Sequence, residues 1–171
     1  MSADDGQEAA HVEQLLAAAR STALAARHCW IATVGEDGAP HARVVSQIPG
    51  VPGEDAWTVW FLTSKASRKA AEIRRDARVT VGYQHDPDSA YAAFGGRAVL
   101  LDDPSELASR WNPAWNAVFP AGADDPDAVF VKIEVERIEL WNLAFKVTPA
   151  PFGKRAAVLR RTGSGPWARE P

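Results

Sequence analysis

Residues 61–83, FLTSKASRKAAEIRRDARVTVGY, contain two strand-like runs separated by a short polar and cationic segment. The first run begins at Trp57 and is largely apolar up to Leu62, and the second occupies 79–83. The segment between them, over 65–75, has the composition of a short helix. A junction of strand and helix exposes backbone N–H groups at the positive end of the helix dipole. The stretch therefore predicts strand, helix and strand, with a position for an anion at the first junction.

The side chains of this junction are rich in groups that bind anions. Thr63 and Ser67 supply hydroxyl donors, and the cations are Lys65, Arg68 and Lys69. Arginine suits bidentate contacts with phosphate. The set fits a monophosphate rather than a nucleoside triphosphate, because the GxxxxGK[ST] pattern is absent. A solvated cationic helix start is the alternative, but cations are unfavourable at a helix N-terminus, so a bound anion is favoured.

Upstream of this stretch, the chain predicts a helix followed by a hairpin. The segment 11–27 is rich in Ala and Leu and places apolar residues on one stripe at helical spacing. These residues are Val12, Leu15, Leu16 and Ala19. We expect residues 1–9 to be disordered. Strand-like segments at 29–34 and 40–47 flank the turn sequence GEDG, and we expect them to form an antiparallel hairpin.

Two later strands carry irregularities that predict bulges. The fifth strand, 90–101, contains the pair Gly95-Gly96, and paired glycines within a strand indicate a bulge or a close backbone approach. The sixth strand, 129–140, alternates apolar and polar residues until Glu136, where the phase reverses. A reversal of phase moves the apolar side chains to the other face, so a bulge is expected there.

Together these segments predict a mainly β protein with a few helices. A further helix is expected after the fifth strand, where Asp103 is suited to cap it and Pro104 to occupy its first position. The third strand, 57–63, is apolar on both faces and is expected to be central. About six mostly antiparallel strands joined by short turns favour a closed or split barrel, because closure removes exposed edges. We assign 10–165 to this domain and 166–171 to a tail.

Composition limits the classes of function. The 171 residues carry a net charge of −3, which argues against general nucleic-acid binding. The N-terminus does not resemble a signal peptide, and no apolar stretch reaches the roughly 18 residues of a membrane span, so we expect a cytoplasmic protein without membrane contact. The four histidines follow no metal-binding spacing, no GxSxG elbow is present, and Cys29 lies in an apolar strand as an inert thiol. We therefore expect no metal site, and the catalytic residues stay unknown.

Two blocks of the sequence resemble a known family. CWIATVGEDGAPHARVV followed by WTVWFLTSKASRKAAEIRRDARVTVGY resembles the pyridoxamine 5'-phosphate oxidase-like split-barrel flavoproteins. RWNPAWNAVFPAGADDPDAVFVKIEVERIELWN is similar to their bacterial general stress protein branch. The resemblance implies a six-stranded antiparallel split β-barrel that binds FMN, with FAD as an alternative, between the two chains of a homodimer. The Trp-rich stretch 111–119 is expected at the dimer interface, because aromatic residues suit an interface core.

The resemblance also implies which residues bind the flavin. A phosphate-binding arginine of the family corresponds to Arg43, and the residues that follow lie beside the flavin ring. The family's Ser-Arg-Lys phosphate grip corresponds to 67–69, and contacts from the partner subunit correspond to Tyr91 and Trp141. The full set is Arg43, Val44, Val45, Ser46, Gln47, Leu62, Thr63, Ser67, Arg68, Lys69, Tyr91 and Trp141.

The C-terminus departs from the oxidases of this family. Those enzymes end in a substrate-gripping stretch of the RLHDR type, whereas this chain ends in GKRAAVLRRTGSGPWAREP. Oxidation of pyridoxamine 5'-phosphate is therefore not expected. The remaining interpretations are an FMN-dependent oxidoreductase of unknown substrate, a non-catalytic flavin-binding stress-response module, and a deazaflavin- or haem-binding protein on the same barrel.

Overall fold

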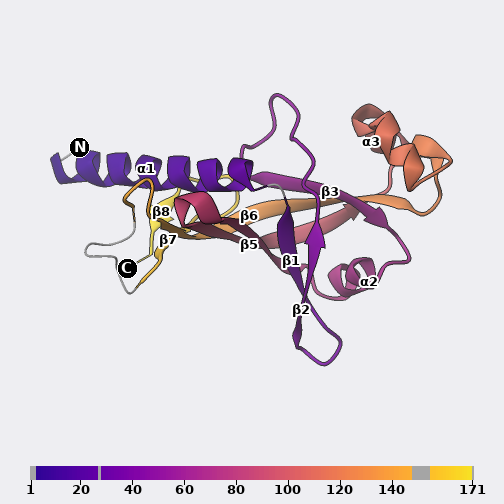
Figure 1. Ribbon diagram of the computed structural model, residues 1–171, viewed down its shortest axis with the longest axis horizontal. Helices are drawn as coiled ribbons and strands as arrows, with labels where there is room; N and C mark the ends of the chain where they lie inside the picture. The colour runs from indigo at the N-terminus through magenta and orange to yellow at the C-terminus, as the bar shows by residue number, and fades with distance from the viewer. Residues whose placement is uncertain (1–2, 27, 148–154, 171) are drawn as a thin grey trace.

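The computed structural model describes residues 3–26, 28–147 and 155–170, which form one antiparallel sheet with helices at its two ends (Figure 1). The helices are α1 (Ala3–Ala25), α2 (Arg68–Arg75) and α3 (Pro104–Arg110), with 3-10 turns η1 (Asp86–Asp88), η2 (Pro113–Ala117) and η3 (Gly122–Asp124). The strands are β1 (Cys29–Val34), β2 (Pro40–Val45), β3 (Thr58–Ser64), β4 (Arg78–His85), β5 (Ala90–Leu101), β6 (Ala128–Asn142), β7 (Ala157–Arg160) and β8 (Ala168–Arg169).

The sheet follows the order β2-β1-β4-β5-β6-β7-β8, and β3 pairs with β6. One edge of β6 pairs with β5, while its other edge pairs first with β3 and then with β7. The sheet does not close fully. Within the described residues, the chain after β2 reaches β3 through a single bridge between Ile48 and Trp60. The predicted mainly β, antiparallel split barrel is confirmed, with eight strands in the described part because the C-terminal segment adds β7 and β8.

The two predicted bulges are one feature of the β5–β6 pair. The register shifts between Gly95, which faces Arg137, and Gly96, which faces Val135, so Glu136 is the extra residue. A side chain at Gly96 has no room, because its Cβ would lie 2.1 Å from the backbone oxygen of Glu134. The glycine pair and the reversed alternation are therefore two sequence signals of the same bulge.

The prediction that the third strand is central is wrong, because β3 has one full strand partner, β6. Both of its faces are nevertheless covered. Val59 and Phe61 face the main core, whereas Trp60 packs into a second apolar cluster. The apolar pattern that indicated a central strand arises because this second cluster covers the outer face of an edge strand.

Helix α1 confirms the predicted apolar stripe but begins earlier than expected. Val12, Leu15 and Leu16 are buried against the sheet. The segment expected to be disordered is helical from Ala3 onward. One contact accounts for this difference: Glu8 accepts two hydrogen bonds of 2.7 Å from Arg169 in β8, which tie this part of the helix to the C-terminal strand. None of the described helices has the length and apolar character needed to cross a membrane.

The segment assigned as a tail is part of the sheet over its described residues. Strand β8 pairs with β7, and Trp167 meets the ring of Trp57 edge-on at 5.5 Å. The guanidinium of Arg161 lies 4.9 Å from the Trp167 ring centroid. These contacts, which no local pattern reveals, fix the C-terminal residues against the core.

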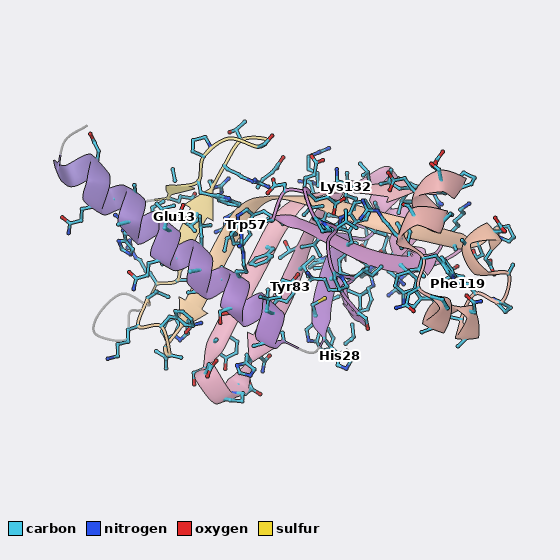
Figure 2. The ribbon with its side chains drawn as sticks, turned by 90° about the horizontal axis from the view of Figure 1, so that it is seen from above. Glu13, His28, Trp57, Tyr83, Phe119 and Lys132 are labelled. Atoms are coloured by element: carbon cyan, nitrogen blue, oxygen red, sulfur yellow. The ribbon has the colours of Figure 1, made fainter. Side chains whose placement is uncertain are left out.

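A second apolar cluster lies at the end of the sheet opposite α1. It is formed by residues 104–124, which we call the aromatic arm, packed on the ends of β3 and β6. Figure 2 shows Phe119 in this arm, far from Glu13 of α1. Trp111 packs edge-on against Phe119 with ring centroids 6.2 Å apart. The stretch expected at a dimer interface therefore packs within its own chain.

Candidate functional site

A hollow of about 530 Å³ lies between the end of β2, the start of α2 and the aromatic arm. This volume falls within the range typical of small-molecule sites, about 300–1,000 Å³. Six residues implied for flavin binding line it. The lining consists of His28, Val44, Val45, Ser46, Gln47, Ile48, Pro49, Leu62, Lys69, Asn112, Trp115, Val118 and Phe119.

The three cations of the β3–α2 junction have different partners. Lys65 pairs with Asp102 at 3.2 Å. Arg68 is 70% exposed and reaches Glu72 at 3.5 Å. Lys69 lines the hollow and makes no ion pair in the described part of the chain. The junction therefore directs one uncompensated positive charge to the hollow.

The start of α2 also supplies hydrogen-bond donors. Ser67 caps the helix by accepting a bond of 3.3 Å from the backbone N–H of Ala70, and its hydroxyl lies 3.4 Å from that of Thr63. The backbone N–H groups of Arg68 and Lys69 have no acceptor among the described residues. Free N–H groups at a helix start are an established geometry for holding phosphate.

The electrostatics of Lys69 favour a bound anion. Burial lowers the pKa of its ammonium group, and the positive charge of Arg43 lowers it further. Both effects penalise the charged form of the lysine. A negative group bound between the two cations would stabilise them, so anion binding and retention of the Lys69 proton support each other.

Arg43, implied as a phosphate ligand, is held by a buried carboxylate. It donates to Glu72 at 2.6 Å, to the backbone oxygen of His41 at 2.8 Å and to the Thr33 hydroxyl. Glu72 is 6% exposed and also accepts from the Thr33 hydroxyl and from His41. An arginine has five N–H donors, so two remain for a ligand.

Burial alone would raise the pKa of Glu72. The hydrogen bonds from Thr33, His41 and Arg43, with the charge of Arg43, overcome it and lower the pKa to about 2. Glu72 is therefore a fixed negative charge at neutral pH. It positions Arg43 behind the hollow and offsets part of the repulsion between Arg43 and Lys69.

Gln47 is oriented for binding by a buried tyrosine. Its side-chain oxygen accepts a hydrogen bond of 2.6 Å from the hydroxyl of Tyr83. Burial raises the pKa of Tyr83, so the phenol stays protonated and donates. The amide N–H groups of Gln47 then have no acceptor in the described part of the chain. They are available to a carbonyl of a ligand in the hollow.

The lining, all within the described residues, contains no carboxylate and no thiol. Cys29 is buried, and burial raises the pKa of its thiol to about 11. This agrees with the predicted inert thiol. The titratable side chains of this lining are His28 and Lys69.

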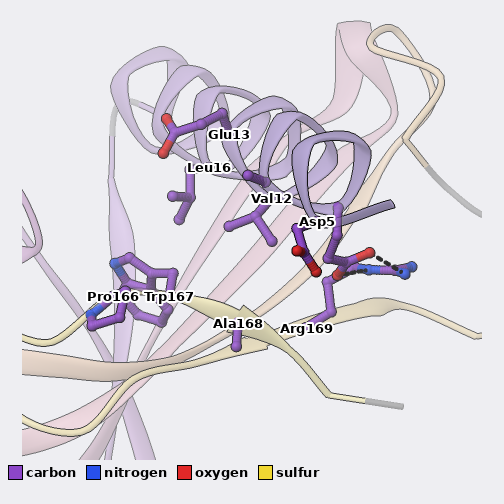
Figure 3. Close-up of a pocket in the computed structure, with 10 residues that line it drawn as sticks. Asp5, Val12, Glu13, Leu16, Pro166, Trp167, Ala168 and Arg169 are labelled. Atoms are coloured by element: carbon purple, nitrogen blue, oxygen red, sulfur yellow. Dashed lines mark hydrogen bonds and ion pairs between the residues drawn. The ribbon is translucent and has the colours of Figure 1, made fainter. Parts of the chain in front are cut away.

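A larger hollow, about 900 Å³, lies between α1 and the C-terminal strand. Val12 and Leu16 point from α1 toward Trp167 and Ala168 (Figure 3). Its charged lining is Asp5, Glu8, Glu13 and Arg169, and Arg169 is occupied by Glu8. This lining would repel a phosphate, so the smaller hollow is the better site for an anionic ligand despite its size.

Comparison with known proteins identifies relatives of the chain. Residues 15–160 match the family model described as pyridoxamine 5'-phosphate oxidase like. The chain belongs to this family. General stress protein 26 of Bacillus subtilis is 32% identical to it over 120 residues, which cover 68% of this chain and 80% of that protein.

Solved structures share the fold. A protein of Clostridium acetobutylicum related to general stress protein 26 superposes with a TM-score of 0.67 at 18% identity, covering 77% of this chain and 91% of that chain. A pyridoxamine 5'-phosphate oxidase-related, FMN binding protein of Nostoc punctiforme gives a TM-score of 0.60 at 16% identity, covering 99% and 97%. A general stress FMN/FAD binding protein of Xanthomonas citri gives 0.61 at 24% identity, covering 74% and 89%.

Six of the twelve residues that the family resemblance implies do not line the hollow: Arg43, Thr63, Ser67, Arg68, Tyr91 and Trp141. The last two lie together elsewhere on the sheet. Tyr91 pairs with Trp141 across β5 and β6, and Tyr91 is 44% exposed. Both lie on the same outer face of the sheet as Trp30. Directly paired residues share a face, and Trp30 pairs with Gly82, which pairs with Ala93. Ala93 and Tyr91 are two residues apart in β5, so they also share that face. Tyr91 and Trp141 therefore lie on a face of the sheet that does not line the hollow of their own chain.

Sequence reasoning missed the part of the lining contributed by the aromatic arm. Asn112, Trp115, Val118 and Phe119 line the hollow, although the arm is distant in sequence from α2. The Trp-rich composition was a visible signal, but it indicated an interface in general and not this contact. Composition cannot reveal which surface an aromatic segment covers.

Proposed function

We propose that this pyridoxamine 5'-phosphate oxidase-like protein binds FMN in the hollow lined by Lys69. The observation that carries the proposal is an unpaired lysine beside free backbone N–H groups at the start of α2. Together with Ser67, Arg68 and the two free donors of Arg43, this set suits a monophosphate. FMN presents that group, and FAD, with a diphosphate, is the alternative cofactor.

The other end of the hollow suits the flavin ring. Val44 and Val45 provide an apolar strand end, and Gln47 offers amide donors to a ring carbonyl. Leu62 adds an apolar surface, while Thr63 supports the Ser67 cap. Bound flavin supplies hydride or electron transfer, and the protein supplies binding and orientation. The role proposed for the chain is thus to hold the phosphate and the ring at opposite ends of one hollow.

A second copy of the chain is part of this proposal. Val44 lines the hollow and is 50% exposed, and its strand partner Trp30 is 53% exposed. The hollow therefore opens beside an exposed apolar face that also carries Tyr91 and Trp141. A homodimer formed through this face would bury these side chains and place those of one copy beside the hollow of the other.

Two kinds of activity fit the same site. The first is an FMN-dependent oxidoreductase, which would turn over repeatedly with a reduced nicotinamide as electron donor. The second is a non-catalytic flavin-binding stress-response module, which would be reduced once and stop. The described lining contains His28 and Lys69 but no carboxylate or thiol, and these side chains fit either activity, so the distinction depends on measured turnover.

The test compares FMN with riboflavin, which lacks the phosphate. Lys69→Ala should weaken FMN binding by about 10- to 100-fold, because hydrogen bonds to charged groups contribute roughly 1.5–3 kcal/mol. Riboflavin affinity should change by less than about twofold. Lys65→Ala is the matched control, because Lys65 is in the same turn but pairs with Asp102. Fluorescence titration of both flavins measures these affinities.

Equal affinity of the parent and Lys69→Ala for FMN would show that the lysine is a solvated surface charge. A parent protein that binds neither flavin would overturn the proposal as a whole. The visible spectrum of the purified protein separates the remaining alternatives, because flavin, deazaflavin and haem absorb at different wavelengths.

A further inference from the structure

The aromatic arm forms the wall of the hollow that faces the end of β2. Asn112, Trp115, Val118 and Phe119 line the hollow on this side. In Figure 1 the arm, which includes α3, lies at the end of the sheet opposite α1. The hollow thus has a cationic part at Lys69 and an aromatic part at the arm.

The arm is held firmly enough to act as a binding wall. Its helix α3 is anchored by Arg110, whose guanidinium pairs with Glu54 and stacks 3.8 Å from the ring centroid of Trp60. Glu54 in turn accepts a hydrogen bond of 3.1 Å from the indole N–H of Trp60. The anchor therefore joins the arm directly to β3.

Trp115 is the arm residue best placed to contact a planar ligand. It meets Trp111 edge-on at 5.5 Å and Phe130 at 5.9 Å. Phe119 is 7% exposed and belongs mainly to the cluster beneath, whereas Trp115 is partly exposed and lines the hollow. Its ring is fixed by aromatic neighbours while part of its surface remains available.

We propose that Trp115 is a specificity-determining residue that packs against the ring system of the bound flavin. The proposal rests on the proposed function, since it takes the ligand of the hollow to be a flavin. An electron-rich indole and an electron-poor isoalloxazine are complementary partners for stacking, and stacking of an aromatic side chain on a heterocyclic ring contributes to binding affinity. Trp115 recognises the ring, which FMN and riboflavin share, whereas Lys69 recognises the phosphate.

The experiment measures the affinity of FMN and riboflavin for Trp115→Leu and Trp115→Phe. Trp115→Leu should weaken the binding of both flavins by the same factor, about 10-fold, and Trp115→Phe should weaken the binding of both by less. The fluorescence of bound flavin should rise in Trp115→Leu, because a stacked indole quenches it. Trp111→Phe is the matched control, since Trp111 belongs to the same cluster but does not line the hollow.

If Trp115→Leu fails to fold, Trp115→Phe retains an aromatic ring for the cluster and still reports on the contact. Parent-like affinity for both flavins in a folded Trp115→Phe and Trp115→Leu would overturn the inference. So would a loss confined to FMN, or an equal loss in Trp111→Phe. If Lys69→Ala selectively weakens FMN binding while Trp115→Leu weakens the binding of neither flavin, the ring contact is refuted and the proposed function stands.

Discussion

The two ends of the molecule each combine a hollow with an arginine–carboxylate pair, but the environments differ. At the α1 end, Glu8 and Arg169 are both nearly half exposed, and the hollow is lined by acids. At the α2 end, Glu72 is 6% and Arg43 is 19% exposed, and the hollow is lined by an unpaired lysine. The larger hollow is therefore the poorer site for an anion. Charge and free donors, rather than volume, identify the candidate site.

The largest expected difference between the ends concerns stability. Glu72→Gln should lower the free energy of unfolding by about 3 kcal/mol at neutral pH, because it leaves the partly buried Arg43 without its charged partner. Glu8→Gln should lower the free energy of unfolding only slightly, because exposed ion pairs contribute little. Urea unfolding of both variants at about pH 7 makes the comparison.

The pH dependence of this loss follows from the lowered pKa of Glu72. Its ordinary value is 4.5 and its value in the folded protein is about 2, so the carboxylate stabilises the fold fully above about pH 4.5. That contribution is lost as the pH falls from about 4.5 to about 2. The deficit of Glu72→Gln should shrink over the same interval. A deficit that is constant between about pH 7 and about pH 3 would contradict this account.

The two ends should also differ in whether their hollow depends on a second copy of the chain for ligand binding. The hollow at α2 borders the exposed Trp30, so we expect light scattering to give about twice the 18.5 kDa mass of the chain. Trp30→Asp should shift the protein to a monomer and weaken flavin binding, because it places a charge in the apolar face. Val99→Asp is the control, since Val99 is 48% exposed but lies beyond the end of β4. A monomeric parent that binds FMN would exclude a shared site.

The last prediction is that the protein does not oxidise pyridoxamine 5'-phosphate, which is the smallest of the expected effects. The C-terminal segment lies at the α1 end, where Arg160 pairs with Glu170 and Arg161 pairs with Asp55. These arginines are engaged in ion pairs and do not line the hollow at α2, so they are poorly placed to bind a substrate there. With FMN present, production of pyridoxal 5'-phosphate from pyridoxamine 5'-phosphate should stay at background. Turnover on the order of 10 per second, typical of enzymes, would show that another segment supplies the grip.

Local patterns in the sequence were sufficient for much of the fold and for the group of donors and cations at the start of α2. The bulge was marked by Gly95-Gly96 and by the reversed alternation at Glu136. Asp103 caps α3 as expected, through bonds from the N–H groups of Ser105 and Glu106. The hydroxyls and cations at the start of α2 are adjacent in the chain, so their spacing alone places Ser67 and Lys69 together.

Tertiary structure decided the features that depend on residues far apart in the chain. The pairing of Arg43 with Glu72 joins β2 to α2, and the arm reaches the hollow only because Trp60 and Phe130 anchor it. The first turns of α1 are ordered by Arg169, which lies 161 positions away. Periods of two and 3.6 residues determine which side chains share a face of one strand or helix. These periods carry no information on which distant segment will cover an apolar face, because the choice of covering segment depends on the packing of the whole sheet.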